Sequence, residues 1–207
     1  MSTLQTAAPV NTFADARTCR NLRSACLGEI HTRRVYQEAA RRMEDADLHV
    51  IAHAFLFTAA QEKEHAAIFS GLLSVYGGNP LPHADILPLL PGEPAALLQA
   101  LAQNEISEAE RLYPCNSRVA LEEGYPRIAA AFQRIAETEA LHARRLRQFE
   151  EALLSGALFR AERPVSWYCL ACGELRTSCE PPDSCPSCGK NRGYFIRSSH
   201  FPFAIEG

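Results

Sequence analysis

Two short stretches, Glu62-Lys63-Glu64-His65 and Glu139-Ala140-Leu141-His142, set the architecture of this 207-residue chain. Each stretch lies inside a long helical pattern, and residues three apart share one face of a helix. The glutamate and histidine of each stretch can therefore offer one oxygen and one nitrogen ligand to a single point. A preceding helical pattern adds a partner glutamate to each stretch, Glu29 to the first and Glu105 with Glu108 to the second.

The residues around these glutamates place them on the buried face of their helices. Positions seven apart return to nearly the same helix face. The positions seven residues before and after Glu29, Glu62, Glu105 and Glu139 are all apolar or aromatic, namely Leu22, Tyr36, Phe55, Phe69, Leu98, Leu112, Phe132 and Leu146. Unpaired buried carboxylates cost on the order of several kcal/mol each and take up protons instead. Their convergence therefore predicts concentrated positive charge between them, which a pair of metal ions supplies.

This ligand set predicts a mainly α fold, a ferritin-like four-helix bundle with a long crossover. One glutamate from each of two helices and Glu-x-x-His from each of the other two are the ligands of ferritin-like di-iron and di-manganese bundles. Such ligands suit iron or manganese and do not exclude zinc. Four helical patterns are expected, over residues 18–44, 47–76, 93–124 and 126–154. Proline-rich residues 79–92 predict the crossover, and Pro114 predicts a kink in the third helix.

Helical periodicity ends near Pro164, and this divides the chain. We expect a loose N-terminal arm over residues 1–17, the di-iron bundle over 18–160 and a small cysteine-rich metal-binding domain over 165–207. The linker over residues 160–164 is short, so the small domain could rest on the bundle of a neighbouring chain. This favours a homodimer.

Two CxxC knuckles, Cys169-Leu170-Ala171-Cys172 and Cys185-Pro186-Ser187-Cys188, define the small domain and are separated by twelve residues. Four thiolates in this arrangement bind one tetrahedral metal ion. Zinc ribbons use nearly the same spacing, so the spacing alone leaves zinc and iron open. A di-iron centre that turns over needs electrons, which favours an iron that cycles between ferric and ferrous. Trp167, Tyr168 and Phe195 are expected to form its apolar shell.

Charge, apolar stretches and the remaining cysteines indicate which partners and cellular locations are expected. A net charge of −3 and a pI near 6.2 leave no basic footprint for nucleic acid. The most apolar stretch, residues 51–60, is too short to cross a bilayer. With no export signal in residues 1–17, we expect a reducing cytoplasm. The four cysteines outside the knuckles show no ligand pairing, and two of them, Cys26 and Cys115, are expected in the core; the four are Cys19, Cys26, Cys115 and Cys179.

Together these motifs resemble the rubrerythrin family, over residues 18–195. The family pattern is a glutamate in helix one, E-x-x-H in helix two, E-x-x-E in helix three, E-x-x-H in helix four and then a rubredoxin-like domain. This chain carries the pattern at Gly28-Glu29, Gln61 to His65, Glu105 to Glu108, Glu139 to His142 and the four knuckle cysteines. The runs Leu112-Tyr113-Pro114 and Glu122-Glu123-Gly124 are also similar to the family.

The resemblance implies a peroxidase of the rubrerythrin type, a non-haem di-iron oxidoreductase that reduces hydrogen peroxide to water in oxidative-stress defence. Its implied metal ligands are Glu29, Glu62, His65, Glu105, Glu108, Glu139, His142, Cys169, Cys172, Cys185 and Cys188. Two iron ions would occupy the bundle, and one iron, or alternatively zinc, the four-cysteine site. Glu29 and Glu139 are expected to bridge the two irons. Glu62 and Glu108 are expected to cap one of them, with His65 replacing Glu108 on reduction.

The resemblance also implies the remaining roles. Glu105 and His142 are expected to cap the other iron, and Tyr36 and Tyr113 to donate hydrogen bonds to the carboxylates. Exchange of a neutral imidazole for an anionic carboxylate keeps the change in net charge of the site small when the two metal ions are oxidised. Electrons would return through the iron of the four-cysteine site from an external reductase or rubredoxin.

Two rival functions remain open at this point. A ferroxidase or iron-handling protein of the ferritin kind, with a structural zinc tail, would use the same bundle, although Glu108 and an in-chain relay are unneeded for storage. A structural or interaction protein with zinc in the tail would leave the bundle idle. Oxygen reduction is a close variant of peroxide reduction.

Overall fold

The structure, a computed structural model, describes residues 12–78 and 90–200. Most of the expected N-terminal arm, most of the expected crossover and the last seven residues lie outside the described residues. The described part is mainly helical with one small sheet, which confirms the expected fold class. None of its helices is long and apolar enough to cross a membrane.

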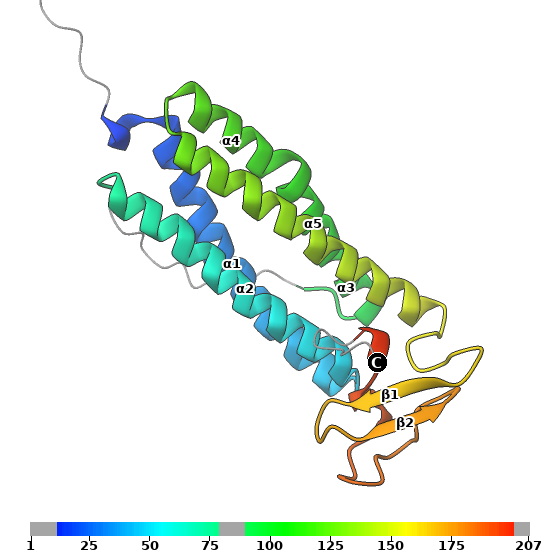
Figure 1. Cartoon of the computed structure of the whole chain (residues 1–207). Helices are drawn as coiled ribbons and strands as arrows, with labels where there is room; N and C mark the ends of the chain where they lie inside the picture. Colours follow the sequence, from blue (N-terminus) through cyan, green and yellow to red (C-terminus); the bar gives the residue numbers. More distant parts are fainter. Residues whose placement is uncertain (1–11, 79–89, 201–207) are drawn as a thin grey trace, which may run out of the picture.

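The bundle consists of two antiparallel pairs of long helices (Figure 1). Helices α1 and α2 pack against each other along their length, and the third helix packs against α5. The third helix is continuous but divided into α3, a π-helical segment and α4. The bounds are Arg17–Asp45 for α1, His49–Val75 for α2, Pro94–Ser107 for α3, Glu108–Leu112 for the π segment, Tyr113–Glu122 for α4 and Pro126–Leu154 for α5.

Local sequence explains where these helices begin and end. Pro94 and Pro126 open α3 and α5, where a missing N–H is harmless. Gly77 follows α2 with φ +79°, a left-handed conformation that glycine adopts without strain. Helix α1 has no side-chain cap of its own. Instead, the Glu123 carboxylate accepts hydrogen bonds from the Thr18 N–H at 2.8 Å and its hydroxyl at 2.6 Å, so the α4–α5 turn caps the neighbouring helix.

The π-helical segment corrects two expectations. The segment lies at Glu108–Leu112, just before Pro114, where the sequence predicts a kink. The segment accommodates one more residue per turn, which changes the phase of every later side chain. Leu112 therefore leaves the buried face and is 45% exposed, while Tyr113 takes the inward position. Cys115, expected in the core, is exposed as well.

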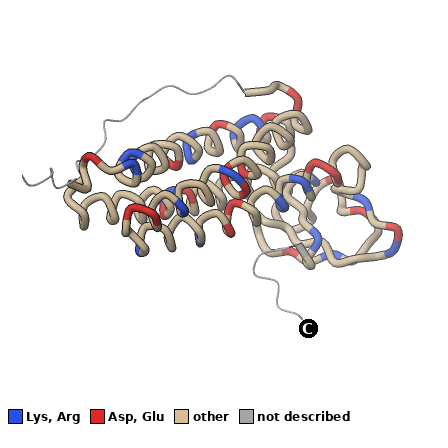
Figure 2. The backbone as a smooth tube through the Cα atoms, turned by 90° about the horizontal axis from the view of Figure 1, so that it is seen from above, with Lys and Arg blue, Asp and Glu red and all other residues tan. Residues whose placement is uncertain are grey.

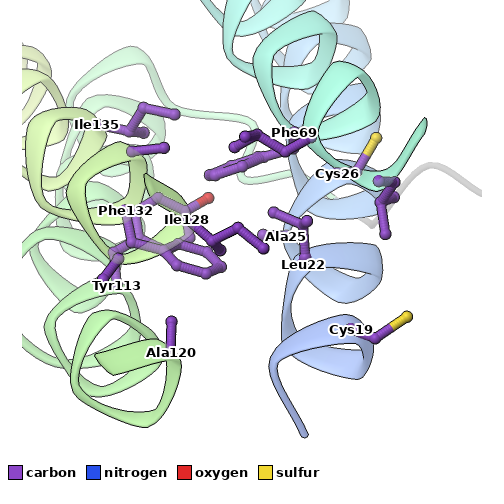
Figure 3. Close-up of a cluster of buried hydrophobic side chains, with 14 of the residues drawn as sticks. Cys19, Leu22, Ala25, Cys26, Phe69, Tyr113, Ala120, Ile128, Phe132 and Ile135 are labelled. Atoms are coloured by element: carbon purple, nitrogen blue, oxygen red, sulfur yellow. The ribbon is translucent and has the colours of Figure 1, made fainter. Parts of the chain in front are cut away.

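Two apolar clusters enclose the middle of the bundle. One contains Leu22, Phe69 and Phe132, and Figure 3 shows side chains from both helix pairs meeting there. The other, toward the opposite end, is built around Tyr36, Phe55, Leu98 and Leu146. All of these side chains are expected inside from the spacing of seven residues, and each is buried. The key glutamates thus form a polar layer between two apolar ones.

The small C-terminal domain contains a three-stranded antiparallel sheet of order β2-β1-β3. Its strands are β1 (Val165–Cys169), β2 (Leu175–Ser178) and β3 (Phe195–Arg197). Trp167 and Phe195 pack beside the buried knuckle cysteines, as expected. Tyr168 does not, because successive side chains of a strand point to opposite faces. It packs against the apolar cluster of the bundle around Phe55 instead.

This domain rests on the turn between α1 and α2 of its own chain, and Figure 2 shows it at one end of the bundle. The Asn191 side chain donates a 2.6 Å hydrogen bond to the Asp47 carboxylate. The rings of Tyr194 and His49 stack with centroids 3.9 Å apart. A Cβ on Gly193 would lie 1.9 Å from the Asp47 carbonyl oxygen, so only glycine allows this approach. These contacts fix the position of the small domain.

Candidate metal centres

Four helices bring six buried ligand side chains together in the polar layer. The two Glu-x-x-His stretches lie on α2 and α5, and single glutamates come from α1 and α3. Two groups of four residues each have one ligand atom per residue, all within 4.8 Å of one another, namely Glu29, Glu62, His65 and Glu139, and Glu62, Glu105, Glu139 and His142. Glu62 and Glu139 belong to both groups. The layer therefore contains two adjacent four-residue ligand sites, called cages below, that share these two carboxylates.

Both histidines face the shared carboxylates of Glu62 and Glu139. His65 Nδ1 lies 3.0 Å from Glu62 and 2.9 Å from Glu139. His142 Nδ1 lies 3.0 Å from Glu62 and 2.7 Å from Glu139. The two rings are nearly parallel, with centroids 5.8 Å apart and an interplanar angle of 23°. The same nitrogen of each ring is therefore directed at the carboxylates.

Two tyrosines hold the outer carboxylates. The Tyr113 hydroxyl donates to Glu29 Oε1, and the Tyr36 hydroxyl donates to Glu105 Oε1. Burial, followed by the charge of the neighbouring glutamate, raises the pKa of both phenols above the ordinary value, so each remains a donor. In each glutamate the other oxygen, Oε2, is left buried without a hydrogen-bond partner. Each carboxylate is thus fixed by one oxygen and directs the other into the layer.

The electrostatics of the layer reflect crowded negative charge. Burial, then the charges of Glu139 and Glu62, raise the pKa of Glu29 well above its ordinary value. Burial raises the pKa of Glu105 to about 7. For Glu62 burial acts in the same direction, but the adjacent imidazoles of His142 and His65 outweigh it and lower its pKa to about 2. Without metal, protons on the histidines and on some carboxylates must compensate the charge.

The donor set fits a pair of metal ions. Buried polar atoms normally have hydrogen-bond partners. The buried atoms of this layer that lack one are Glu29 Oε2, Glu62 Oε1, Glu105 Oε2, both Glu139 oxygens and His142 Nδ1. Every one of them belongs to the two cages. Carboxylate oxygens and imidazole nitrogens are ligands for iron or manganese, and two cations would satisfy these atoms together.

Glu108 lies beside the cages but belongs to neither. It sits at the start of the π segment, and its Oε1 accepts a 3.4 Å hydrogen bond from the Asn104 side chain. Burial, then the charges of Glu105 and Glu139, raise its pKa to about 8. His65, not Glu108, therefore occupies the ligand position of the first cage in this structure.

The four-cysteine site has the dimensions of a metal tetrahedron. The four Sγ atoms all lie within 4.8 Å of one another, with Cys169–Cys188 at 3.9 Å and Cys172–Cys185 at 3.7 Å. A metal–sulfur bond of about 2.3 Å gives a tetrahedral S–S edge of about 3.8 Å. Each knuckle ends in a glycine with positive φ, Gly173 at +82° and Gly189 at +74°, which turns the chain back over the site. The expected four-thiolate site is therefore geometrically formed.

The sequence reasoning missed three polar neighbours of the cages. Gln61 Oε1 lies 3.1 Å from His142 Nε2, and Asn104 binds Glu108. Arg145 donates to the Thr58 hydroxyl at 3.0 Å across the α2–α5 seam. The only available signal for Gln61 was its place directly before Glu62. Asn104 lies four residues before Glu108 on the same helix, a spacing that the sequence does show. Arg145 and Thr58 meet only because α2 and α5 are neighbours.

Comparisons with known proteins agree with this geometry. A family model described as Rubrerythrin matches residues 20–150. A rubrerythrin of Porphyromonas gingivalis is 35% identical over 185 residues, covering 87% of this chain and 89% of that protein. One of Clostridium perfringens is 33% identical over 181 residues, covering 86% and 93%.

Solved structures extend the likeness to the whole architecture. The fully reduced, all-ferrous state of nigerythrin is 25% identical with a TM-score of 0.62, covering 95% of this chain and 96% of that chain. A Desulfovibrio desulfuricans bacterioferritin has a TM-score of 0.64 at 21% identity, covers 68% of this chain and 82% of that chain, and shows the bundle fold alone. The paired Glu/His cages, the four-cysteine site and these matches together establish that the chain belongs to the rubrerythrin family of iron-dependent oxidoreductases.

Proposed function

We propose that this protein is a di-iron peroxidase that reduces hydrogen peroxide to water, with electrons delivered through iron in the four-cysteine site. The observation that carries the proposal is the pair of buried cages that share Glu62 and Glu139, in the same chain as a four-thiolate site. Iron ions bound in the cages would supply the two electrons that break the O–O bond. The remaining steps concern what the side chains of this chain do around them.

In this proposal Glu62 and Glu139 would contribute ligand oxygens to both metal ions. They are the residues common to both cages, whereas Glu29 contributes to one cage only. The family resemblance implies Glu29 and Glu139 in this role, and we propose Glu62 in place of Glu29 for this reason. Glu29 with His65 completes the first position, and Glu105 with His142 completes the second.

Glu108 and His65 act as alternative ligands of the first position. His65 is within the cage, and Glu108 lies next to it with its carboxyl group held by Asn104. Exchange of imidazole for carboxylate adds one negative charge to the site. This would compensate part of the positive charge that bound metal ions gain on oxidation. The raised pKa of Glu108 supports this role as an alternative ligand, because its carboxyl group remains protonated and neutral while it lies outside the cage.

Tyr36 and Tyr113 keep Glu105 and Glu29 in place during turnover. Because each phenol remains protonated, its hydrogen bond holds one carboxylate oxygen while the other faces the metal position. The apolar clusters on either side exclude water from the layer. These residues therefore position ligands rather than transfer protons.

Electron delivery favours a homodimer. The small domain touches its own bundle at Asp47, beyond the end of α1. The rise of 1.5 Å per residue makes the distance along α1 from Glu29 to Asp45 roughly 25 Å. A neighbouring chain arranged head to tail would bring its four-cysteine site closer to the cages. An external reductase or rubredoxin would reduce that four-cysteine site. We propose that the protein is located in the cytoplasm.

Peroxide turnover of Glu108→Ala tests the proposal. We expect a folded protein that binds two irons in its bundle but reduces peroxide at least about tenfold more slowly, since the charge-compensating ligand is gone. The matched control is Glu110→Ala, an exposed glutamate in the same π segment. Turnover equal to that of the unchanged protein would remove the exchange mechanism. Negligible peroxide turnover together with dozens of irons stored per chain would instead support the ferritin-like alternative.

A further inference from the structure

The two cage histidines are held differently at their outer nitrogens. His142 turns Nδ1 toward Glu139 and Glu62, at 2.7 and 3.0 Å. Its other nitrogen, Nε2, lies 3.1 Å from the side-chain oxygen of Gln61. An amide oxygen only accepts, so Nε2 carries the proton and donates it. The lone pair of the neutral ring is then on Nδ1, the nitrogen that faces the cage.

His65 has the same inward contacts but no such outer bond. Its Nδ1 lies 2.9 Å from Glu139 and 3.0 Å from Glu62. Among the residues that the structure describes, none accepts a hydrogen bond from its Nε2. The ring is therefore held at one nitrogen, whereas the ring of His142 is held at both.

The two Glu-x-x-His stretches differ in the residue directly before the glutamate, and this explains the difference. Gln61 directly precedes Glu62 on α2, and it reaches across the seam to the histidine of α5. The equivalent residue directly before Glu139 on α5 is Thr138. Its side chain is shorter, and its hydroxyl donates to the Arg134 carbonyl of its own helix at 3.3 Å. Thr138 thus provides His65 with no counterpart of the Gln61 bond.

The surroundings of Gln61 keep it in position. Three residues before it on α2, Thr58 accepts a 3.0 Å hydrogen bond from Arg145, which lies three residues after His142 on α5. The Arg145 guanidinium also lies over the Phe57 ring, 5.2 Å from its centre. The two helices are thus joined one turn away from the Gln61–His142 bond, which fixes the distance that the glutamine must span.

We propose that Gln61 is a positioning residue that makes His142 a permanent ligand of the second metal, while Thr138 leaves His65 free to exchange with Glu108. The inference rests on the proposed metal ligands. A hydrogen bond to the outer nitrogen of a ligating histidine fixes the tautomer and the ring orientation, and its loss costs about 10- to 100-fold in metal affinity. Because His142 contributes to one cage only, this loss should fall on one metal of the two.

The test is iron release from the fully reduced, iron-loaded protein to a strong ferrous chelator without oxygen. For Gln61→Leu we expect one bundle iron to leave about 10- to 100-fold faster, with the other unchanged. Gln61→Glu, which retains an acceptor oxygen, should release both at close to the original rates. Gln133→Leu, an exposed change on α5, controls for the loss of a surface amide. Iron in the four-cysteine site provides an internal reference.

The outcomes separate the inference from the proposed function. Gln61→Leu with both irons released at the original rates, or with both equally accelerated, would overturn the role of Gln61 while leaving the di-iron centre intact. An unchanged protein that holds no pair of irons in its bundle would instead overturn the proposed function. A second variant, Thr138→Gln, adds an acceptor opposite His65 and should slow release of the other iron. Release from Thr138→Gln at the original rate would contradict the explanation offered for the mobility of His65.

Discussion

The metal-free bundle should lose stability as the pH rises from about 4.5 to 8, and Glu108 should contribute to this loss. Its pKa is raised from the ordinary 4.5 to about 8, chiefly by burial and then by neighbouring carboxylates. In the folded state the group therefore keeps its proton where the unfolded chain has released it. The resulting stabilisation is fully present below pH 4.5 and is lost as the pH rises through 8.

The size of this effect follows from the difference between the two pKa values. At 1.36 kcal/mol per pH unit, the free energy of unfolding should fall by on the order of 5 kcal/mol at most between pH 4.5 and 8. Glu105, with a pKa of about 7, and His65, with a pKa of about 9, act in the same direction. Glu62 acts oppositely, because its pKa of about 2 provides stability that is lost as the pH falls below 4.5. The metal-free protein should therefore be most stable near pH 4.5.

Urea unfolding of chelator-treated protein, followed by far-ultraviolet circular dichroism, measures this dependence. Glu108→Gln mimics the protonated side chain and should reduce the slope between pH 5 and 8. Glu110→Gln, an exposed change in the same π segment, should retain it. Restoring the metal should reverse the trend, because metal ions bind the ionised carboxylates. A flat profile for the unchanged metal-free protein, or equal slopes for the two variants, would refute the reasoning.

Three further predictions address electron delivery, domain docking and helix capping. Cys172→Ser should abolish peroxide turnover driven by an external donor, while a chemically reduced bundle still reacts with peroxide in a single turnover; donor-driven turnover that survives would exclude the relay. Gly193→Ala places a methyl group against the Asp47 carbonyl and should release the small domain from the α1–α2 turn, visible as faster domain motion in NMR relaxation, with iron binding in the bundle unchanged. Glu123→Gln removes the charged acceptor at the start of α1 and should lower the free energy of unfolding by about 1 kcal/mol in urea titrations at pH 7. The difference should be smaller below pH 4, because Glu123, whose pKa lies below its ordinary value, then takes up a proton.

Much of the bundle could be predicted because its helices obey a simple period. Spacing alone places Leu22, Phe55 and Phe132 inside, and the motif alone places the knuckle cysteines together. Leu112 and Cys115 are misplaced by the same spacing because a π-helical turn shifts the phase of the third helix.

The arrangement of the cages was harder to predict than their membership. Helical spacing shows that Glu29, Glu62 and Glu139 share one layer, but not which pair lies between both metal positions. That depends on the lateral order of the four helices, and it replaced Glu29 with Glu62 in the proposed bridge. The contact between Gln61 and His142 was not predicted for a related reason, since the two residues lie on different helices.

The π segment also has a consequence for anyone who transfers residues between related bundles. Inward positions before Glu108 include Leu98, Leu101 and Glu105, whereas those after it include Tyr113, Asn116 and Ala120. A straight-helix template laid through this region would shift each later assignment by one residue. Grafts of a third helix should therefore be cut on one side of residues 108–112 or include the whole segment, so that the numbering of both flanks stays in register.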